Sequence, residues 1–193
     1  MSDTQHMITP QEFATLARPC SRHLDDDEVM AYVSECEQLY IIPAIGYGNF
    51  KAAITAITGS TGSTFDSTFD GTFNPSTAIN GGEWEYTKPK GECNDTTPEE
   101  GLHYCVGLKR TLAYYAYAQM MKADGAINAR SGTMRHDDQY AQHLDDKMKQ
   151  YNNIMNIAEA YMDGCLQYLK YHTVDHAVKP FRGGRARIHA IGD

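Results

Sequence analysis

The longest regular pattern in the chain is a seam of apolar or small side chains between Leu144 and Leu169. The steps along it alternate between four and three residues, which is a heptad pattern that places the seam on one face of an α-helix. Further apolar residues widen this face, so we expect a long helix covered by other helices of the same chain. An intermolecular coiled coil is the alternative. The seam consists of Leu144, Met148, Tyr151, Met155, Ala158, Met162, Cys165 and Leu169.

A second pattern of the same kind predicts a partner for this helix. Thr97-Pro98-Glu99-Glu100 combines a capping threonine, a proline suited to the first helical position and a glutamate three residues after the cap. A four/three pattern follows, and Asp124-Gly125 ends it, so we expect a helix from Thr97 to Ala123. The predicted core residues of the two helices are Leu108, Leu112, Tyr115, Leu144, Met148, Tyr151, Met155, Met162 and Leu169.

Shorter helices are expected before this pair. Thr9-Pro10-Gln11-Glu12 repeats the start signal, and the acidic run Asp25–Glu28 matches the positive end of a helix dipole. Pro43 and Gly46 predict that the chain turns, and a further helical piece should begin near Asn49. The stripe of the helix after Asp25 consists of Val29, Val33, Cys36 or Glu37, and Tyr40.

The region from Thr58 to Gly82 is rich in Gly, Ser, Thr and Asp and contains a four-residue repeat centred on Phe65, Phe69 and Phe73. Ser, Thr, Asp and Gly oppose a helix, so we expect an extended arm or hairpin. Trp84 follows in Glu83–Thr87, whose alternation is typical of a strand. Three phenylalanines in a hydrophilic loop favour contact with another subunit or protein. A flap folded on its own domain is the alternative.

The residues after each long helix have their own character. Ala126–Arg135 is compatible with β-structure or a loop, with a turn expected at Ser131-Gly132-Thr133. From His172 to Asp193, four basic residues and two acidic ones leave a charge of +2, whereas the whole chain carries −8. A basic, glycine-containing arm can hold acidic protein surface or a phosphate backbone, and the alternation from Arg185 to His189 suits strand addition. A disordered terminus is the alternative. The arm residues expected at an interface are Lys179, Phe181, Arg182, Arg185 and Arg187.

Composition narrows the class of protein. The net charge of −8 over 193 residues argues against a nucleic-acid binder with a broadly basic surface. The N-terminus lacks the pattern of a secretory signal and no uncharged apolar run could span a bilayer, so we expect no membrane partner.

The five cysteines are scattered without a CxxC pair, and Cys36, Cys105 and Cys165 fall on apolar helix faces. We therefore expect reduced core thiols.

Catalytic and metal motifs are weak. There is no Gly-rich phosphate loop, GxSxG or HExxH motif in the sequence. His172 and His176, joined by Asp175, form the best candidate for a metal site, and His136, Asp137, Asp138 and His143 form a looser one. A zinc site needs three or four ligands. We expect no enzyme activity, no cofactor and no resident metal, and the alternative is a metal-dependent enzyme around His172 and His176.

Four stretches together resemble a known family. They are ECEQLYIIPAIG (Glu35–Gly46), LKRTLAYYAYA (Leu108–Ala118), ARSGTMR (Ala129–Arg135) and Tyr151–Leu169. They are similar to the small helical head–tail connector proteins of tailed bacteriophages, especially those of Bacteroides-like hosts, including crAss-like phages. The likeness covers most of the chain outside the Ser/Thr/Phe insertion, which is a departure from the shorter family members.

The resemblance implies a structural virion protein. Connectors of this family assemble as a ring, typically twelvefold, below the portal protein, where they extend the DNA channel and dock the next tail component. It therefore implies a homo-oligomer that contacts the portal and adjacent tail or connector proteins, with double-stranded DNA passing through the lumen without sequence-specific binding. The expected location is the virion, after assembly in the host cytoplasm.

The predicted architecture is a mainly α helical bundle with two long antiparallel helices. We expect one domain, residues 1–178, with an inserted loop at 58–97, followed by a basic C-terminal arm at 179–193. The second hypothesis for function is a small helical nucleic-acid-binding module that uses the arm together with Arg130 and Arg135.

Overall fold

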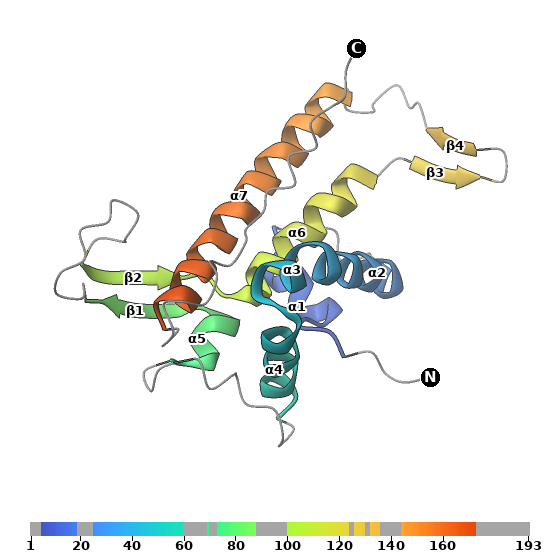
Figure 1. Cartoon of the computed structure of the whole chain (residues 1–193). Helices are drawn as coiled ribbons and strands as arrows, with labels where there is room; N and C mark the ends of the chain where they lie inside the picture. Colours follow the sequence, from blue (N-terminus) through green and yellow to red (C-terminus); the bar gives the residue numbers. More distant parts are fainter. Residues whose placement is uncertain are drawn as a thin grey trace, which may run out of the picture.

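The computed structural model describes residues 5–18, 25–59, 69, 73–87, 100–123, 126–129, 132–135 and 144–172. These residues form a mainly α-helical fold with two small two-stranded antiparallel sheets (Figure 1). The expectation of a mainly α protein is confirmed.

Two helices, α6 (Leu108–Ala123) and α7 (Leu144–Tyr171), form the centre of the fold. They run antiparallel, because the start of α6 meets the end of α7 and the end of α6 meets an earlier turn of α7 (Figure 1). The hydroxyl oxygen of Thr111 lies 3.7 Å from the sulfur of Cys165, and Lys122 lies over the ring of Tyr151. The buried residues of this contact include Leu108, Leu112, Tyr115, Ala116, Ile154, Ala158, Met162 and Leu169.

The first turns of α7 extend past the end of α6. At about 1.5 Å per residue, a helix of 28 residues spans roughly 42 Å and one of 16 residues roughly 24 Å. Met148 is therefore 49% exposed, which corrects its assignment to the core. Tyr151 and Met155 are half-buried, and of Leu144 the structure describes only the backbone.

Helix α6 begins at Leu108, not at Thr97 as expected, and this is a correction. Residues 101–105 form strand β2 (Gly101–Cys105), which pairs with β1 (Gly82–Tyr86) in the register Trp84 opposite His103. Gly107, at φ +91°, then packs so closely against the backbone of Gly81 that a side chain would not fit there. The pairing with a distant strand thus overrides the local start signal, whose residues 97–99 lie outside the described residues.

The N-terminal helices follow the sequence signals. Helix α1 (Pro10–Leu16) has the expected capping box, in which Thr9 and Glu12 exchange side-chain and backbone hydrogen bonds. Helix α2 (Asp26–Cys36) begins after Asp25, whose side chain caps it, and it packs against α6. Its inner stripe buries Val29, Val33, Cys36 and Glu37.

The chain does not turn at Pro43. Helix α2 continues through a π-helical turn, η1 (Glu37–Ile41), into α3 (Ile42–Ile45), and the turn comes at Gly46, at φ +83°. In a regular helix the Pro43 ring would clash with the carbonyl four residues earlier. The wider π turn shifts the pattern so that Ile42 N–H donates to the Glu37 carbonyl instead. Helix α4 (Tyr47–Thr58) follows, close to its expected start.

The region expected as an extended arm contains a short helix, α5 (Pro75–Asn80), which is a correction. Its start is defined by the Asn74 side chain, which accepts from Ser76 N–H, and by Pro75 at the first position. Residues 60–68 and 70–72 lie outside the described residues. Strand β1 follows α5 and confirms the strand expected there.

The second sheet joins β3 (Ala126–Ala129) and β4 (Gly132–Arg135), so the β alternative for this region is correct. Gly132 and Thr133 lie within β4, not in the expected turn. Figure 1 shows this hairpin projecting from the helices beyond the end of α6. Among the described residues, no helix is long and apolar enough to cross a membrane.

Candidate interaction surface

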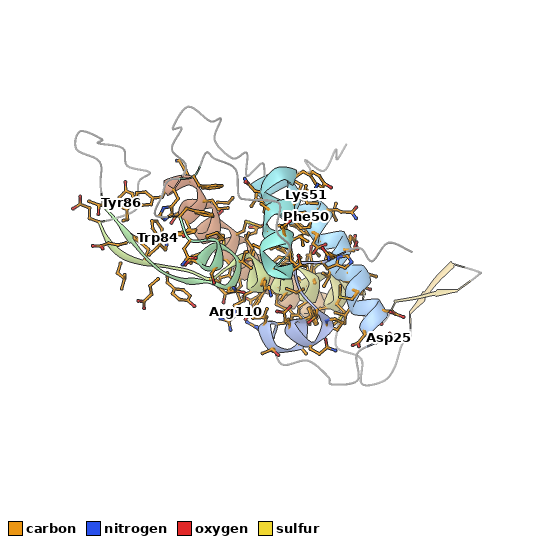
Figure 2. All side chains as sticks on the ribbon, turned by 90° about the horizontal axis from the view of Figure 1, so that it is seen from below. Asp25, Phe50, Lys51, Trp84, Tyr86 and Arg110 are labelled. Carbon is orange, nitrogen blue, oxygen red and sulfur yellow. The ribbon has the colours of Figure 1, made fainter. Side chains whose placement is uncertain are left out.

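An aromatic cluster fills the junction between the β1–β2 sheet and the last turns of α7. Figure 2 shows Trp84 and Tyr86 of β1 beside this end of the helix. The ring of Trp84 lies 5.3 Å from that of Tyr171 and 5.6 Å from that of Tyr168, measured between centroids. Trp84 is buried at the centre of the contact. The cluster consists of Phe69, Phe73, Trp84, Tyr86, His103, Tyr168, Tyr171 and His172.

Hydrogen bonds from α7 hold two other segments onto the cluster. The Tyr168 hydroxyl accepts from Asn74 N–H at 2.9 Å and donates to the Asn74 carbonyl at 3.1 Å, which fixes the residue that caps α5. The Tyr171 hydroxyl accepts from Thr87 N–H at 3.4 Å, just past the end of β1. The end of α7 therefore supports α5 and the sheet together.

The outer face of the β1–β2 sheet, on the side away from the aromatic cluster, is half apolar and half acidic. On β2, Leu102 and Tyr104 are 69% and 61% exposed. On β1, Glu83 lies opposite Tyr104 and Glu85 opposite Leu102, and both carboxylates are exposed. We call these four residues the outer sheet face. Because its other side is fixed by the aromatic cluster, this face is a preformed surface.

A buried carboxylate ties the N-terminal segment to the π turn. Glu37 is only 4% exposed, and one of its oxygens accepts from Met7 N–H at 2.7 Å. The other oxygen lies 2.8 Å from the Nδ1 atom of His6. A second ion pair between distant parts of the chain joins Lys109 to Glu12. Burial raises the pKa of Glu12, but the hydrogen bond and the charge of Lys109 outweigh burial, so the pKa of Glu12 is lowered. Both contacts hold α1 onto the body.

The π turn also presents Tyr40 to α6. The Tyr40 and Tyr115 rings stack with centroids 4.4 Å apart, and Gln119 Nε2 donates to the Tyr40 hydroxyl at 2.7 Å. Burial raises the pKa of both tyrosines, and it raises the pKa of the Cys36 thiol beneath them to about 12. These groups are therefore neutral at ordinary pH and serve packing.

Among the described residues, Cys36, Cys105 and Cys165 are free thiols buried in the core, as expected, although Cys105 ends strand β2 and does not lie on a helix. The sulfur atoms of Cys105 and Cys165 lie 3.6 Å apart where β2 meets α7. The Cys105 thiol and burial together hold the pKa of Cys165 well above its usual value. The same hydrogen bond with Cys165 lowers the pKa of Cys105, so the pKa values of the two thiols shift in opposite directions.

The residues expected at an interface fall into two groups, those that contact their own domain and those that lie outside the described residues. Phe69 and Phe73 stack with centroids 4.2 Å apart, and Phe73 packs on Tyr168, so both phenylalanines contact their own domain. Trp84 is buried by the same cluster. Their role toward a partner stays a prediction. Phe65 and the arm residues Lys179, Phe181, Arg182, Arg185 and Arg187 lie outside the described residues.

The structure gives no support to the two candidate metal sites expected from the sequence. His172 is buried in the aromatic cluster, whereas Asp175 and His176 lie outside the described residues, as do His136, Asp137, Asp138 and His143. Within the part of the chain that the structure describes, no group of three or more His, Cys, Asp or Glu side chains is placed to hold a metal ion.

Sequence reasoning missed the outer sheet face and the Glu37 anchor. Leu102 and Tyr104 fall within the helix expected from Thr97 to Ala123, although the alternation of Leu102, His103, Tyr104 and Cys105 is also that of a strand. Glu37 was considered only as a stripe position. No local signal marks it as buried, because its partners His6 and Met7 are 30 residues away.

Comparison with known proteins identifies a family for the C-terminal half of the chain. A family model described as a family of unknown function (DUF6712) matches residues 79–177, which include both sheets, α6 and α7. Neither a curated protein nor a solved structure matches the chain.

Proposed function

We propose that this chain, which belongs to a family of unknown function (DUF6712), is a structural subunit of a bacteriophage head–tail connector. In this proposal it forms a ring below the portal protein, joins the capsid to the tail and extends the DNA channel. Helix packing supplies the rigid body of the subunit, and the sheets, the Phe-containing region and the basic arm supply the contacts. The sequence resemblance to connectors is the origin of the proposal.

One structural observation supports it above the others: the antiparallel α6–α7 pair carries a small sheet at each end. Strand β2 ends at Cys105, directly before α6, and β3 begins at Ala126, directly after it (Figure 1). A subunit of a ring that joins two structures needs contact surfaces on more than one side. A rigid body with a β element at either end suits that requirement, because the short connections couple each sheet to the helices.

The size of the helical contact suits a subunit that keeps its shape under load. Leu108, Leu112 and Ala158 are fully buried between the helices, as are neighbours on α2 such as Val33. Close-packed interiors of this kind deform little. The outer sheet face and the exposed Met148 at the far end of α7 leave apolar surface outside this core. Exposed apolar groups of this kind are common at protein–protein contacts.

Electron microscopy and native mass spectrometry of the purified protein, alone and mixed with a portal protein from the same genome, test the proposal. We expect a discrete ring-shaped oligomer, either free or formed on the portal. A chain that stays monomeric and does not bind the portal at micromolar concentration would contradict the proposal. Steep, salt-dependent binding of the isolated protein to DNA would instead favour the nucleic-acid-binding alternative.

A further inference from the structure

We propose that the chain's own basic C-terminal segment, residues 181–187, docks on the outer sheet face formed by Glu83, Glu85, Leu102 and Tyr104. This inference does not depend on the connector role. It concerns the free subunit and names a segment of the same chain as the occupant of an exposed sheet face.

The surface has the chemistry of a docking face. Leu102 and Tyr104 stand side by side on β2, both more than half exposed, and each is paired across the sheet with a glutamate of β1. No ion pair of Glu83 or Glu85 occurs among the described residues. The opposite side of the same strands is closed by the aromatic cluster, with Trp84 buried. An occupant therefore needs positive charge and apolar surface on one side.

The C-terminal segment provides that combination with matching spacing. In an extended chain, alternate side chains share one side, so Phe181, Arg185 and Arg187 would face the same way. Arg185 and Arg187 are two residues apart, as are Glu83 and Glu85, and this step is roughly 6.8 Å in both strands. The guanidinium groups can then pair with the two carboxylates and stack on the Tyr104 ring.

The exit point of the chain favours its own segment over any other occupant. The last described residue, His172, is buried against Trp84 and Tyr171, so the chain leaves α7 beside this sheet. The thirteen residues from His172 to Arg185 can span up to about 45 Å, well beyond the roughly 17 Å length of a five-residue strand. A tether of this length gives an effective concentration on the order of millimolar, so even a weak contact is populated within one chain.

Energy transfer from Trp84, the only tryptophan, to a dansyl group on the C-terminus of the full chain measures docking directly. We expect high transfer at low salt that falls as sodium chloride is raised, since the contacts are exposed ion pairs. The double variant Glu83→Gln/Glu85→Gln should weaken the docking equilibrium about two- to tenfold, as expected for two exposed pairs. The control Glu28→Gln/Glu35→Gln removes the same charge from exposed positions on α2 and should leave transfer unchanged.

Two further outcomes decide the matter. Exchanging the charges in one chain, with Glu83→Lys/Glu85→Lys and Arg185→Glu/Arg187→Glu, should restore the transfer that either half abolishes. Near-ultraviolet circular dichroism checks that each variant keeps its aromatic packing. Equal transfer in the wild type and the Glu83→Gln/Glu85→Gln variant at low salt would overturn the proposal. Transfer that disappears on dilution with excess unlabelled chain would also overturn it, because the segment would then bind a second copy.

Discussion

At the scale of single residues, the structure depends on a few buried polar and ionisable groups whose neighbours lie far away in the sequence. Glu37 holds the segment before α1, and Cys36 and Tyr115 are kept neutral in the core between α2 and α6. The stability of the protein depends on each of these groups in a different way. The Glu37 carboxylate must keep its hydrogen-bond donors, and the Cys36 thiol and the Tyr115 phenol must stay protonated.

We predict that Glu37→Ala destabilises the protein by about 1–3 kcal/mol, because the buried Met7 N–H loses its acceptor. Urea unfolding followed by far-ultraviolet circular dichroism measures the change. The neighbouring Glu35→Ala removes an exposed carboxylate from α2 and should change stability by less than about 0.5 kcal/mol. Equal effects of the two substitutions would show that Glu37 does not anchor the N-terminal segment.

Stability should fall in alkali. Burial raises the pKa of Cys36 from its ordinary value of 9.0 to about 12 in the folded protein, so the unfolded chain loses this proton first as the pH rises. The resulting stabilisation is complete below pH 9 and is lost progressively toward pH 12, at about 1.4 kcal/mol per pH unit for one such group. The raised pKa of Tyr115 adds in the same direction at higher pH.

Urea midpoints measured between pH 8 and pH 11 test this dependence. The Cys36→Ala variant should be less stable at pH 8, because a buried side chain is shortened, but it should show a shallower decline above pH 9. A variant whose decline is as steep as that of the wild type would exclude Cys36 as a source of the effect.

At the scale of elements, the sequence predicted the helix bounds correctly where the signal lay within the element itself. The bounds of α7 and the capping box of α1 were predictable, because a heptad seam over 26 residues and the Thr9–Glu12 pair act within their own segments. The start of α6 was not, since β2 is specified by pairing with β1, which begins 19 residues earlier and places Gly82 opposite Cys105 and Tyr86 opposite Gly101. The π turn before Pro43 was also not predictable from the local sequence. Proline alone indicates the end of a helix, but packing against α6 allows the helix to continue here.

The candidate site shows the same limit. Phe69, Phe73 and Trp84 stood out in the sequence as aromatic residues in a polar setting, and the structure brings them together. Tyr168, Tyr171 and His172, which complete the cluster, come from the last turns of a helix about 100 residues later. Only the tertiary arrangement identifies them as the support of the sheet.

Two glycines offer a matched test at this scale. Gly107 has φ +91° and its backbone meets that of Gly81, so Gly107→Ala should destabilise the junction between β2 and α6 by at least about 1–3 kcal/mol. Gly164 lies within α7 with open space around it, and Gly164→Ala should stabilise the protein by about 0.5–1 kcal/mol. Thermal unfolding of both variants is the measurement, and shifts of the same sign would contradict this account of Gly107.

At the scale of the whole molecule, the body and the appended segments are expected to do different work. Among the described residues, the buried core joins α1, α2, α6 and α7 into one body. Truncation after Val178 should therefore leave the unfolding temperature within a few degrees of the wild type while abolishing docking to the portal or the next component. Co-sedimentation with the portal and differential scanning calorimetry measure the two effects. Unchanged docking would remove the arm from the proposed interface.

The short links at either end of α6 have a geometric consequence. A sheet precedes the helix by two residues and another follows it by two, so neither can drift along the helix axis independently. The distance between them is then set by a count of residues, roughly 1.5 Å for each one in α6. The length of α6 therefore sets the separation of the two sheets. Lengthening α6 and α7 by seven residues each would increase this separation by about 10 Å and would nearly preserve the relative rotation of the two sheets.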